Sequence, residues 1–279
     1  MIPRSNLYKL LRRLHWLRAR DPIDENVRGW NWDKPPLRPR AYLGLGVSEI
    51  ASRYCETMRD IWLRRVENVQ PKITEPMRRG LIIHQIIHLA IQDALRELIN
   101  GKTPWDAYEY LCTKAHRKLR NLNIYEKWAL NLYKMIIMKW LSESSNGSIP
   151  LLLTEHIVDG SQLGLSRYLR VDALAEGGVV IEFKYGSWRD HYRAILAGYA
   201  LALESYIETP IDYGLVILIN DLDNKVPTIR IEPIYIDTDS RMDFIEYRDE
   251  AIDMLISGNE PPKSSTCSLN CPFREVCMN

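Results

Sequence analysis

The sequence predicts an α/β protein with a mostly helical N-terminal half, a central mixed sheet and a cysteine-rich C-terminal tail. Three observations support this fold class. Apolar residues recur at helical spacing up to about residue 145, short β-branched runs separated by turn residues begin after Asn146-Gly147, and three cysteines fall within the last 13 residues. A sheet flanked by helices is the most economical way to bury both kinds of apolar face.

Length and composition are those of an ordinary globular protein. A chain of 279 residues can bury a sizeable core, as one large domain or as one domain with an appendage. Its formal net charge of +1 means that any surface for nucleic acid must be a local patch. The N-terminus has no apolar signal-peptide region, and the most apolar run, LIIHQIIHLAI, is too short to cross a bilayer. We therefore expect a cytoplasmic protein that does not bind membranes.

The first 40 residues are expected to form a basic and aromatic N-terminal extension (1–40). Residues 5–19 have the pattern of a short amphipathic helix, and residues 21–40 are expected to be irregular because they contain four prolines. The basic residues of the helix region are Arg4, Lys9, Arg12, Arg13, Arg18 and Arg20. They form either a patch that binds DNA or a solvated helix face.

The next segment, residues 41–149, is expected to be a helical region that contains Cys55 and His84. Its first helix is predicted over residues 47–67, with Ser48 as a plausible N-cap. Further helices are predicted at 76–98, 103–121 and 125–143.

Residues 150–260 are expected to contain the sheet. Apolar, β-branched runs predict strands at 151–158, 169–175, 179–183, 213–219 and 228–236. Helical patterns at 188–206 and 240–256 complete the order β-β-β-α-β-β-α. The last segment, residues 261–279, is expected to be an irregular tail that holds a metal or a cluster.

The strongest indication of chemistry is Asp172 together with the triplet Glu182-Phe183-Lys184. Gly177-Gly178 predicts a tight turn between the strands that carry them, so the two carboxylates can lie side by side near one end of the sheet. Period-2 alternation points Lys184 to the same face as Glu182. Two acids and a lysine suit phosphodiester hydrolysis assisted by Mg²⁺ or Mn²⁺. The alternative is a solvated ion pair at a strand end.

His84 lies on the helix that precedes the sheet, where its ring nitrogen can add a metal ligand to the carboxylate pair. His84 and His88 share one helix face, but Gln85 replaces the glutamate that a zinc protease of the H-E-x-x-H type requires. The sequence therefore argues against a zinc protease. The alternative is an ordinary core or surface histidine.

Three cysteines in the tail, Cys267, Cys271 and Cys277, have the spacing C-x3-C-x5-C. Core packing does not explain them, because the segment has almost no apolar periodicity. Five cysteines in a cytoplasmic chain also argue against a disulfide framework. A fourth ligand is expected from Cys55, on the helix predicted upstream, and four thiolates suit either Zn²⁺ or an iron–sulfur cluster. Cys112 is expected to be a buried free thiol.

The helix predicted after Lys184 carries basic and aromatic residues. Arg189, His191 and Arg193 are positioned to contact DNA phosphates. The alternative is that the apolar and aromatic residues are only the buried stripe of this helix, namely Tyr192, Ile195, Leu196, Tyr199 and Leu203.

Taken together these motifs resemble a known arrangement. G-x-x-x-H from Gly80 to His84, Asp172, the E-x-K triplet, Tyr199 and the four cysteines occur in the order found in RecB-like (restriction-endonuclease-like) nucleases with a four-cysteine iron–sulfur cluster. Residues 44–279 are most similar to the CRISPR-associated exonuclease family, and within it to the archaeal branch found in subtype A systems.

The resemblance implies a role for each matching residue. His84, Asp172 and Glu182 would bind the catalytic Mg²⁺ or Mn²⁺, with the Phe183 carbonyl as a further ligand. Lys184 would position the attacking water, and Tyr199 would help hold the DNA or the lysine. Cys55, Cys267, Cys271 and Cys277 would ligate a 4Fe–4S cluster. Such proteins resect single-stranded or frayed DNA ends for CRISPR spacer acquisition, and their partners would be the CRISPR integrase and other adaptation proteins; a homo-oligomer is also allowed.

Two departures from the family pattern leave other functions open. Ile195 stands where the family motif Q-x-x-x-Y has glutamine, and the first cysteine interval is one residue longer than the commoner C-x2-C. Gln162 or Arg193 is a candidate to compensate for the missing glutamine. The first alternative function is a non-catalytic subunit that binds DNA or the integrase through a degenerate nuclease site. The second is a zinc-stapled structural or DNA-binding protein.

Overall fold

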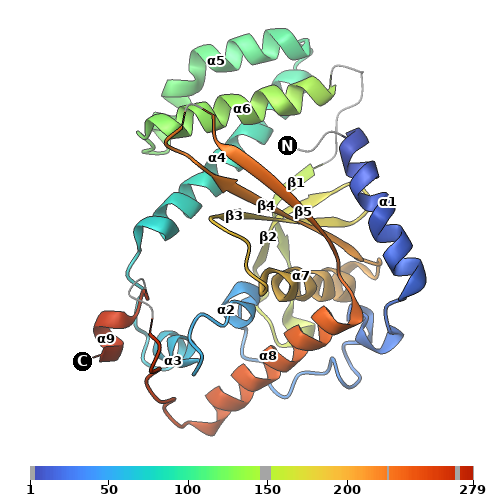
Figure 1. Ribbon diagram of the computed structural model, residues 1–279, viewed down its shortest axis with the longest axis vertical. Coiled ribbons are helices and arrows are strands. Elements are labelled where there is room, and N and C mark those ends of the chain that lie inside the picture. Colours follow the sequence, from blue (N-terminus) through green and yellow to red (C-terminus); the bar gives the residue numbers. More distant parts are fainter. Residues whose placement is uncertain (1–3, 145–151, 225, 268–270, 279) are drawn as a thin grey trace.

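A computed structural model describes residues 4–144, 152–224, 226–267 and 271–278, and its centre is a five-stranded sheet with helices on both faces (Figure 1). The strand order is β1-β2-β3-β4-β5. Only β3 and β4 are parallel, and the other neighbouring pairs are antiparallel. The predicted α/β class with a mixed sheet is therefore confirmed.

The strands lie where the alternating pattern predicts them, with small changes at their ends. Their bounds are β1 Leu152–Val158, β2 Leu169–Ala175, β3 Val179–Tyr185, β4 Tyr213–Asn220 and β5 Thr228–Tyr235. Leu151, the first residue of the predicted strand 151–158, lies outside the described residues. The turn between β2 and β3 uses Gly177 and Gly178 at φ 76° and 73°, a conformation that favours glycine.

The longer helices also agree with the sequence pattern: α1 Arg4–Arg20, α4 Glu75–Ile99, α5 Pro104–Asn121, α6 Lys127–Ser144, α7 Tyr192–Ile207 and α8 Thr238–Ser257. One start differs, since α7 begins at Tyr192 and not at residue 188. Gly186 has a φ of 114°, and the Trp188 indole donates to the Asp190 carboxylate over 3.0 Å, so a turn occupies these residues. This turn directly follows Tyr185, the last residue of β3.

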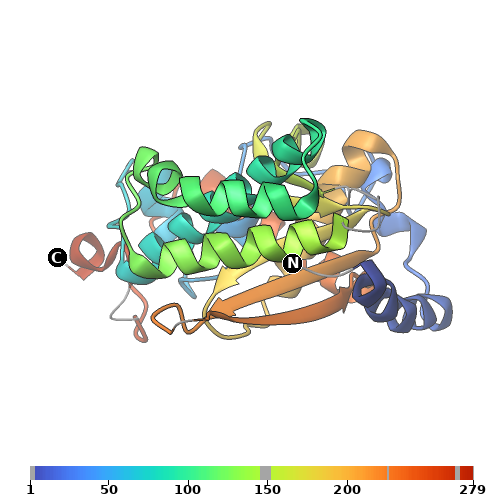
Figure 2. The ribbon, with the colours of Figure 1, turned by 90° about the horizontal axis from the view of Figure 1, so that it is seen from above.

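Two apolar cores lie on the two faces of the sheet. Ile181 and Phe183 of β3 face the core shared with α4, α5 and α6, whereas Val180 faces the core shared with α7 and α8. Figure 2 shows α5 and α6 lying side by side on the outside of the first core. The helical N-terminal half and the sheet therefore share one core, which fixes α4 across the sheet.

The basic helix α1 lies along β5, at the edge of the sheet (Figure 1). Leu7, Leu11 and Leu14 are buried there, while most of its charged side chains stay exposed. Arg18 is 2.7 Å from Asp212, which belongs to a buried group of charges with Arg28, Glu204 and Arg241. The fold is compatible with both interpretations of this helix, a solvated basic face and a DNA-binding patch.

The predicted helix over residues 47–67 is wrong as a single element. It is divided into α2 Val47–Ala51 and α3 Arg59–Arg65, and the N-cap is Gly46 instead of Ser48. Arg53 and Met58 have positive φ values of 40° and 57°, which a continuous helix does not allow.

The tail also departs from the expected irregular structure, because it contains a short helix, α9 Arg274–Met278. Figure 1 shows α9 beside α3, at the end of the molecule away from α5. The turn between α2 and α3 lets Leu63 pack on Phe273 and Cys277, in a small third core. Tertiary packing thus overrides the helical pattern of residues 47–67.

Candidate metal centre and its cleft

Three acids lie in one row across three neighbouring strands. The β2–β3 register, in which Ala173 faces Ile181, places Asp172 opposite Glu182. The β1–β2 register, with Thr154 opposite Ala173, places Glu155 on the other side of Asp172. The Phe183 backbone N–H donates to Asp172 Oδ2 over 2.8 Å and holds that carboxylate across the hairpin. The hairpin therefore brings Asp172 and Glu182 side by side, as the sequence predicts.

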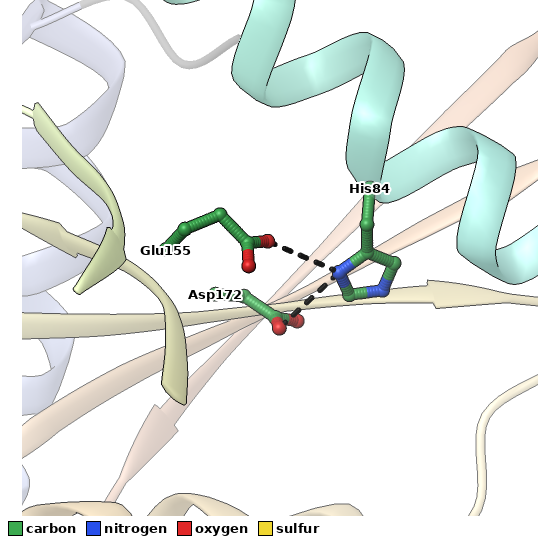
Figure 3. Close-up of side chains that lie close together, drawn as sticks. All are labelled: His84, Glu155 and Asp172. Atoms are coloured by element: carbon green, nitrogen blue, oxygen red, sulfur yellow. Dashed lines mark ion pairs between the residues drawn. The ribbon is translucent and has the colours of Figure 1, made fainter. Parts of the chain in front are cut away.

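His84 reaches this row from α4. Its Nδ1 lies 3.2 Å from Asp172 Oδ1 and 3.9 Å from Glu155 Oε1 (Figure 3). Its other nitrogen, Nε2, lies 3.1 Å from the Phe183 carbonyl oxygen. The fold thus brings together His84, Asp172 and the Phe183 carbonyl, which the family resemblance groups as metal ligands.

Glu155 is the residue that sequence reasoning missed. Ligand atoms of His84, Glu155 and Asp172 all lie within 4.8 Å of one another, and in the described part of the chain this is the only such group of three or more histidine, cysteine or acidic ligands. Glu155 also has a φ of 55°, which is rare for a residue with a side chain. The available indication was the register itself: pairing the strands predicted at 151–158 and 169–175 puts Glu155 beside Asp172.

Glu182 and Lys184 share one face of β3, as the alternation predicts. Lys184 Nζ lies 2.5 Å from Glu182 Oε1. The other oxygen, Glu182 Oε2, is buried and has no hydrogen-bond partner among the described residues. A buried carboxylate oxygen without a donor is costly unless a cation approaches it. The orphaned oxygen therefore fits a site for a metal ion.

Burial and neighbouring charges set the protonation of these groups. Burial and the charge of Asp172 raise the pKa of Glu182 to about 7, although Lys184 opposes the shift. Burial also favours neutral Asp172, but His84, Lys184 and the Phe183 N–H outweigh it and lower the pKa of Asp172. For His84, burial favours the neutral ring, but the charge of Asp172 outweighs it and raises its pKa. Without a bound cation, the group therefore holds protons that a metal ion would displace.

A cleft of about 790 Å³ opens over this group. One wall comes from α4 with His84, and another comes from the cysteine-rich tail with Phe273. The cationic side chains in its lining are Arg64, Arg170, Lys184 and Arg189. Arg170 Nη1 also lies 3.3 Å from Glu155 Oε2. Positive charge around an acidic centre suits a polyanion that must be held over a bound metal.

Of the residues singled out in and just before α7, some line the cleft and others are buried in the core. Arg189 and His191, just before the helix, line the cleft, whereas Arg193 lies over the Trp188 ring. The stripe of Tyr192, Ile195, Leu196, Tyr199 and Leu203 is buried, as the alternative interpretation predicts, although Tyr192 and Ile195 also contact the cleft.

Tyr199 lies beneath the acids and does not line the cleft. Burial and the charges of Glu182 and Asp172 raise its pKa, and its hydroxyl is hydrogen-bonded to Ser48. Tyr199 is therefore a neutral phenol close to the acidic row.

The candidate cluster ligands gather at the other end of the cleft. Cys55 lies in the turn between α2 and α3, not on a helix as predicted, while Cys271 and Cys277 pack in the small third core. Burial and the neighbouring thiols of Cys267 and Cys55 raise the pKa of Cys271. The structure thus brings Cys55 to the tail. No three of these described sulfurs lie within 4.8 Å of one another.

The remaining residues singled out in the sequence have ordinary surroundings. His88 Nδ1 is 2.7 Å from the Thr154 hydroxyl, so His88 is bound to the sheet and does not join His84. Cys112 is half-buried, not fully buried as predicted, and its thiol contacts the Tyr108 hydroxyl. Among the described helices none is both long and apolar enough to cross a membrane.

Comparison with known proteins gives consistent matches over the whole chain. The family model described as CRISPR-associated exonuclease Csa1 matches residues 1–279. A CRISPR-associated exonuclease Csa1 from Thermoproteus tenax is 32% identical over 285 residues, which cover 100% of both chains. A protein of the same description from Saccharolobus solfataricus is 31% identical over 274 residues, covering 91% of this chain and 92% of the relative.

Proposed function

The chain belongs to the CRISPR-associated exonuclease Csa1 family, and we propose that it is a metal-dependent deoxyribonuclease that removes nucleotides from DNA ends. The observation that carries this proposal is the buried Glu182 oxygen without a partner, next to the cluster of His84, Glu155 and Asp172. Imidazole and carboxylate ligands in this number suit Mn²⁺ or Mg²⁺.

His84, Asp172 and Glu182 would hold the divalent ion, with the Phe183 carbonyl and Glu155 next to it. When bound, Mg²⁺ or Mn²⁺ would stabilise negative charge on the scissile phosphate and lower the pKa of a nearby water. The chain itself orients these ligands: the Phe183 N–H fixes Asp172, and α4 fixes His84. Because the hairpin backbone already holds these side chains in place, little conformational entropy is lost when the metal and the DNA bind.

Lys184 acts in this proposal as a cation and hydrogen-bond donor, not as a general base. Burial favours its neutral form, but the carboxylates of Glu182 and Asp172 outweigh burial and raise the pKa of Lys184. The ammonium group therefore keeps its proton at neutral pH. From its position beside Glu182 it can donate to a phosphate oxygen, where negative charge increases as the P–O bond breaks.

The DNA would lie along the cleft, with its phosphates facing Arg64, Arg170 and Arg189. Single-stranded or frayed ends are the proposed substrates. Within a CRISPR system this activity would trim new spacers in the cytoplasm before they pass to the integrase. The names of the relatives support the CRISPR-associated nuclease role, and the finer step of spacer acquisition is our proposal.

The four cysteines would hold a 4Fe–4S cluster that joins the tail to the turn between α2 and α3. The donor set supports this, since four thiols from two distant segments meet around a small core. Four thiolates suit either a zinc ion or an iron–sulfur cluster, and we propose the cluster because of the family resemblance. The longer interval between Cys267 and Cys271 includes residues 268–270, which lie outside the described residues.

The test compares wild-type protein with Glu182→Gln on end-labelled single-stranded DNA in Mn²⁺. Loss of the carboxylate should lower the cleavage rate by at least about 100-fold, because the site loses a charged ligand. Glu232→Gln is the matched control: Glu232 lies in the same row of the sheet, opposite Val216, on the far strand β5. If Glu182→Gln cuts as fast as the control, the proposed centre is wrong.

The second candidate function is a non-catalytic subunit that binds DNA or the integrase. The specific observation in its favour is Ile195, which places an apolar side chain in the cleft where the family motif has glutamine. Binding of single-stranded DNA by wild-type protein, without cleavage in Mn²⁺, would favour this function. Ile195→Gln is then the substitution to examine for restored cleavage.

A further inference from the structure

A second groove, of about 650 Å³, lies beside the catalytic cleft. We call it the Tyr42–Tyr168 groove, and its lining includes those two tyrosines, Trp32 and Arg167. Tyr168 and Arg167 belong to the connection between β1 and β2, the strands that carry Glu155 and Asp172. Nothing in the proposed cleavage chemistry uses these side chains.

No described residue lines both the groove and the cleft, but two stretches of backbone carry lining residues of each. Residues 42–44 line the groove, and Ser48 in the following helix lines the cleft. Likewise Tyr168 lines the groove and Arg170 lines the cleft. Tyr168 precedes Asp172 by four residues, about 13 Å of extended chain.

The two tyrosine rings are unusually open to water. Tyr168 is 79% exposed and Tyr42 is 63% exposed. Aromatic rings usually bury most of their surface, so exposed rings gathered at one place indicate a contact surface. Neither ring therefore serves the apolar cores of the fold.

The backbone beneath the rings is firmly held. The Ser166 N–H donates to the Leu45 carbonyl over 2.9 Å, and the Gly44 N–H donates to the Gly164 carbonyl over 3.1 Å. These bonds join the segment that carries Tyr42 to the connection that carries Tyr168. A stiff platform with exposed rings binds with little loss of conformational freedom.

The side chains that line the Tyr42–Tyr168 groove indicate the kind of ligand that it can bind. Among the described residues that line the groove, Arg167 is the only charged one, and none of them carries a carboxylate. Flat aromatic faces beside a cation suit nucleobases joined by phosphates, which stack on tyrosine with little dependence on sequence. A duplex hides its base faces in the helical stack, so only an unpaired strand can use such a platform.

We propose that the Tyr42–Tyr168 groove binds the bases of single-stranded DNA that lead to the catalytic cleft, an inference that rests on the proposed deoxyribonuclease function. The groove stacks bases on Tyr42 and Tyr168, and Arg167 contacts a phosphate. Unpaired ends are thereby held next to Asp172, whereas paired ends are not. The groove is a source of selectivity for single strands that is separate from the metal ligands.

The test measures the Kd of a labelled 12-nucleotide oligothymidine in EDTA, where cleavage does not interfere. The double variant Tyr42→Ala/Tyr168→Ala should bind at least about tenfold more weakly, because two stacking contacts are lost. Tyr42→Phe/Tyr168→Phe should bind within about twofold of wild type, since phenylalanine keeps the stacking face. The matched control is Tyr125→Ala/Tyr206→Ala, which removes two exposed tyrosines outside the groove.

Duplex and RNA probes complete the experiment. A blunt duplex should lose much less affinity than the single strand in the alanine variant, and an equal loss would overturn stacking as the cause. An oligouridine that behaves like oligothymidine would support base stacking and extend it to RNA. Thermal melting of each variant shows whether it is folded. If the double alanine variant unfolds, the single variants Tyr42→Ala and Tyr168→Ala test the groove, and binding equal to wild type in both would overturn it.

The outcomes separate the two proposals. If wild type cuts DNA in Mn²⁺ but the alanine variant keeps its Kd and KM, the groove proposal is wrong and the nuclease stands. If wild type binds the oligonucleotide through the tyrosines but does not cut it, the groove stands and the nuclease is wrong. Wild-type protein that does not bind oligothymidine would overturn the groove proposal directly.

Discussion

The acidic row on the sheet and the cysteine-rich end of the molecule both join residues far apart in the sequence, yet the fold supports them differently. His84 and Asp172 are carried by a long helix and a hairpin, each packed in a large core. Cys55 and Cys277 are carried by a turn and a five-residue helix around a small core. The comparison indicates that the large core holds the acidic row in place, whereas the small core leaves the cysteine-rich end in need of further stabilisation.

The energetic difference follows from the sizes of the cores. Burying side chains such as Leu63 and Phe273 contributes about 1.5–3 kcal/mol each. Ordering the chain costs roughly 1–2 kcal/mol per residue, and the tail has few other apolar contacts. We therefore propose that the cysteine-rich end gains stability from a bound cluster. In the same proposal the acidic row uses a metal ion only for chemistry, and without the ion a proton on Glu182 stabilises the row.

The largest effect expected from this comparison is a pH dependence of the metal-free protein. Glu182 has a pKa of about 7 in the folded chain and an ordinary value of 4.5 when unfolded. The folded state thus binds more protons between these values, so this contribution to stability is present below about pH 4.5 and is lost as pH rises to about 7. It amounts to roughly 3 kcal/mol.

Thermal melting in EDTA from pH 5 to 8 measures this loss. His84, whose pKa is also raised, adds to it in the same direction, whereas Asp172, whose pKa is lowered, titrates below this range. Glu182→Gln should flatten the curve, and Mn²⁺ should stabilise wild type more at pH 8 than at pH 5. A curve for Glu182→Gln that matches wild type would contradict a proton held at Glu182.

The next effect concerns the cysteine-rich end. Cys277→Ala should lower the free energy of unfolding by at least about 2 kcal/mol, because it removes a buried thiol that would be a ligand of the proposed cluster. Chemical denaturation measures it, with Cys112→Ala as the control thiol outside this end.

Visible absorbance near 400 nm, recorded on the same samples, identifies the bound group, since an iron–sulfur cluster absorbs there and zinc does not. Loss of cleavage at unchanged stability in Cys277→Ala would contradict a stabilising role for the cysteine-rich end. The cysteines would then take part in the chemistry and would not only support the cleft wall.

The smallest expected effect tests whether Glu155 belongs to the proposed metal site. Glu155→Gln should raise the Mn²⁺ concentration that gives half-maximal cleavage by about tenfold, because the ligand cluster loses one charge. The rate at saturating Mn²⁺ should change less, since Asp172 and Glu182 remain. Titration of activity with Mn²⁺ measures both quantities, beside Glu232→Gln. A lower saturated rate with unchanged Mn²⁺ affinity would assign Glu155 to the substrate and not to the metal.

Much of the β2–β3 hairpin was predictable because the signals for it are local in the sequence. The Gly177-Gly178 turn and the alternation of β2 and β3 place Asp172, Glu182 and Lys184 with no knowledge of the rest of the chain. The helical periodicity of residues 76–98 likewise predicts α4 almost to its ends. Hydrophobic periodicity and the preferences of turn residues act over a few neighbouring residues, so both can be recognised directly in the sequence.

Other features were decided only by contacts between distant segments. His84 meets the Phe183 carbonyl across 99 positions of the chain, and no local pattern specifies how α4 crosses the sheet. The break between α2 and α3 contradicts a helical pattern, because packing Leu63 against the tail outweighs helix propensity.

The sequence by itself thus determined the order of the elements, the hairpin and the residues able to bind a metal or a cluster. Tertiary structure decided that Glu155 joins His84 and Asp172, that Cys55 reaches the tail, and that Tyr42 and Tyr168 form one groove. The physical reason is that secondary structure depends on the spacing of neighbours along the chain. A site depends on which distant faces pack together, and that is settled by the total burial and pairing of the whole fold.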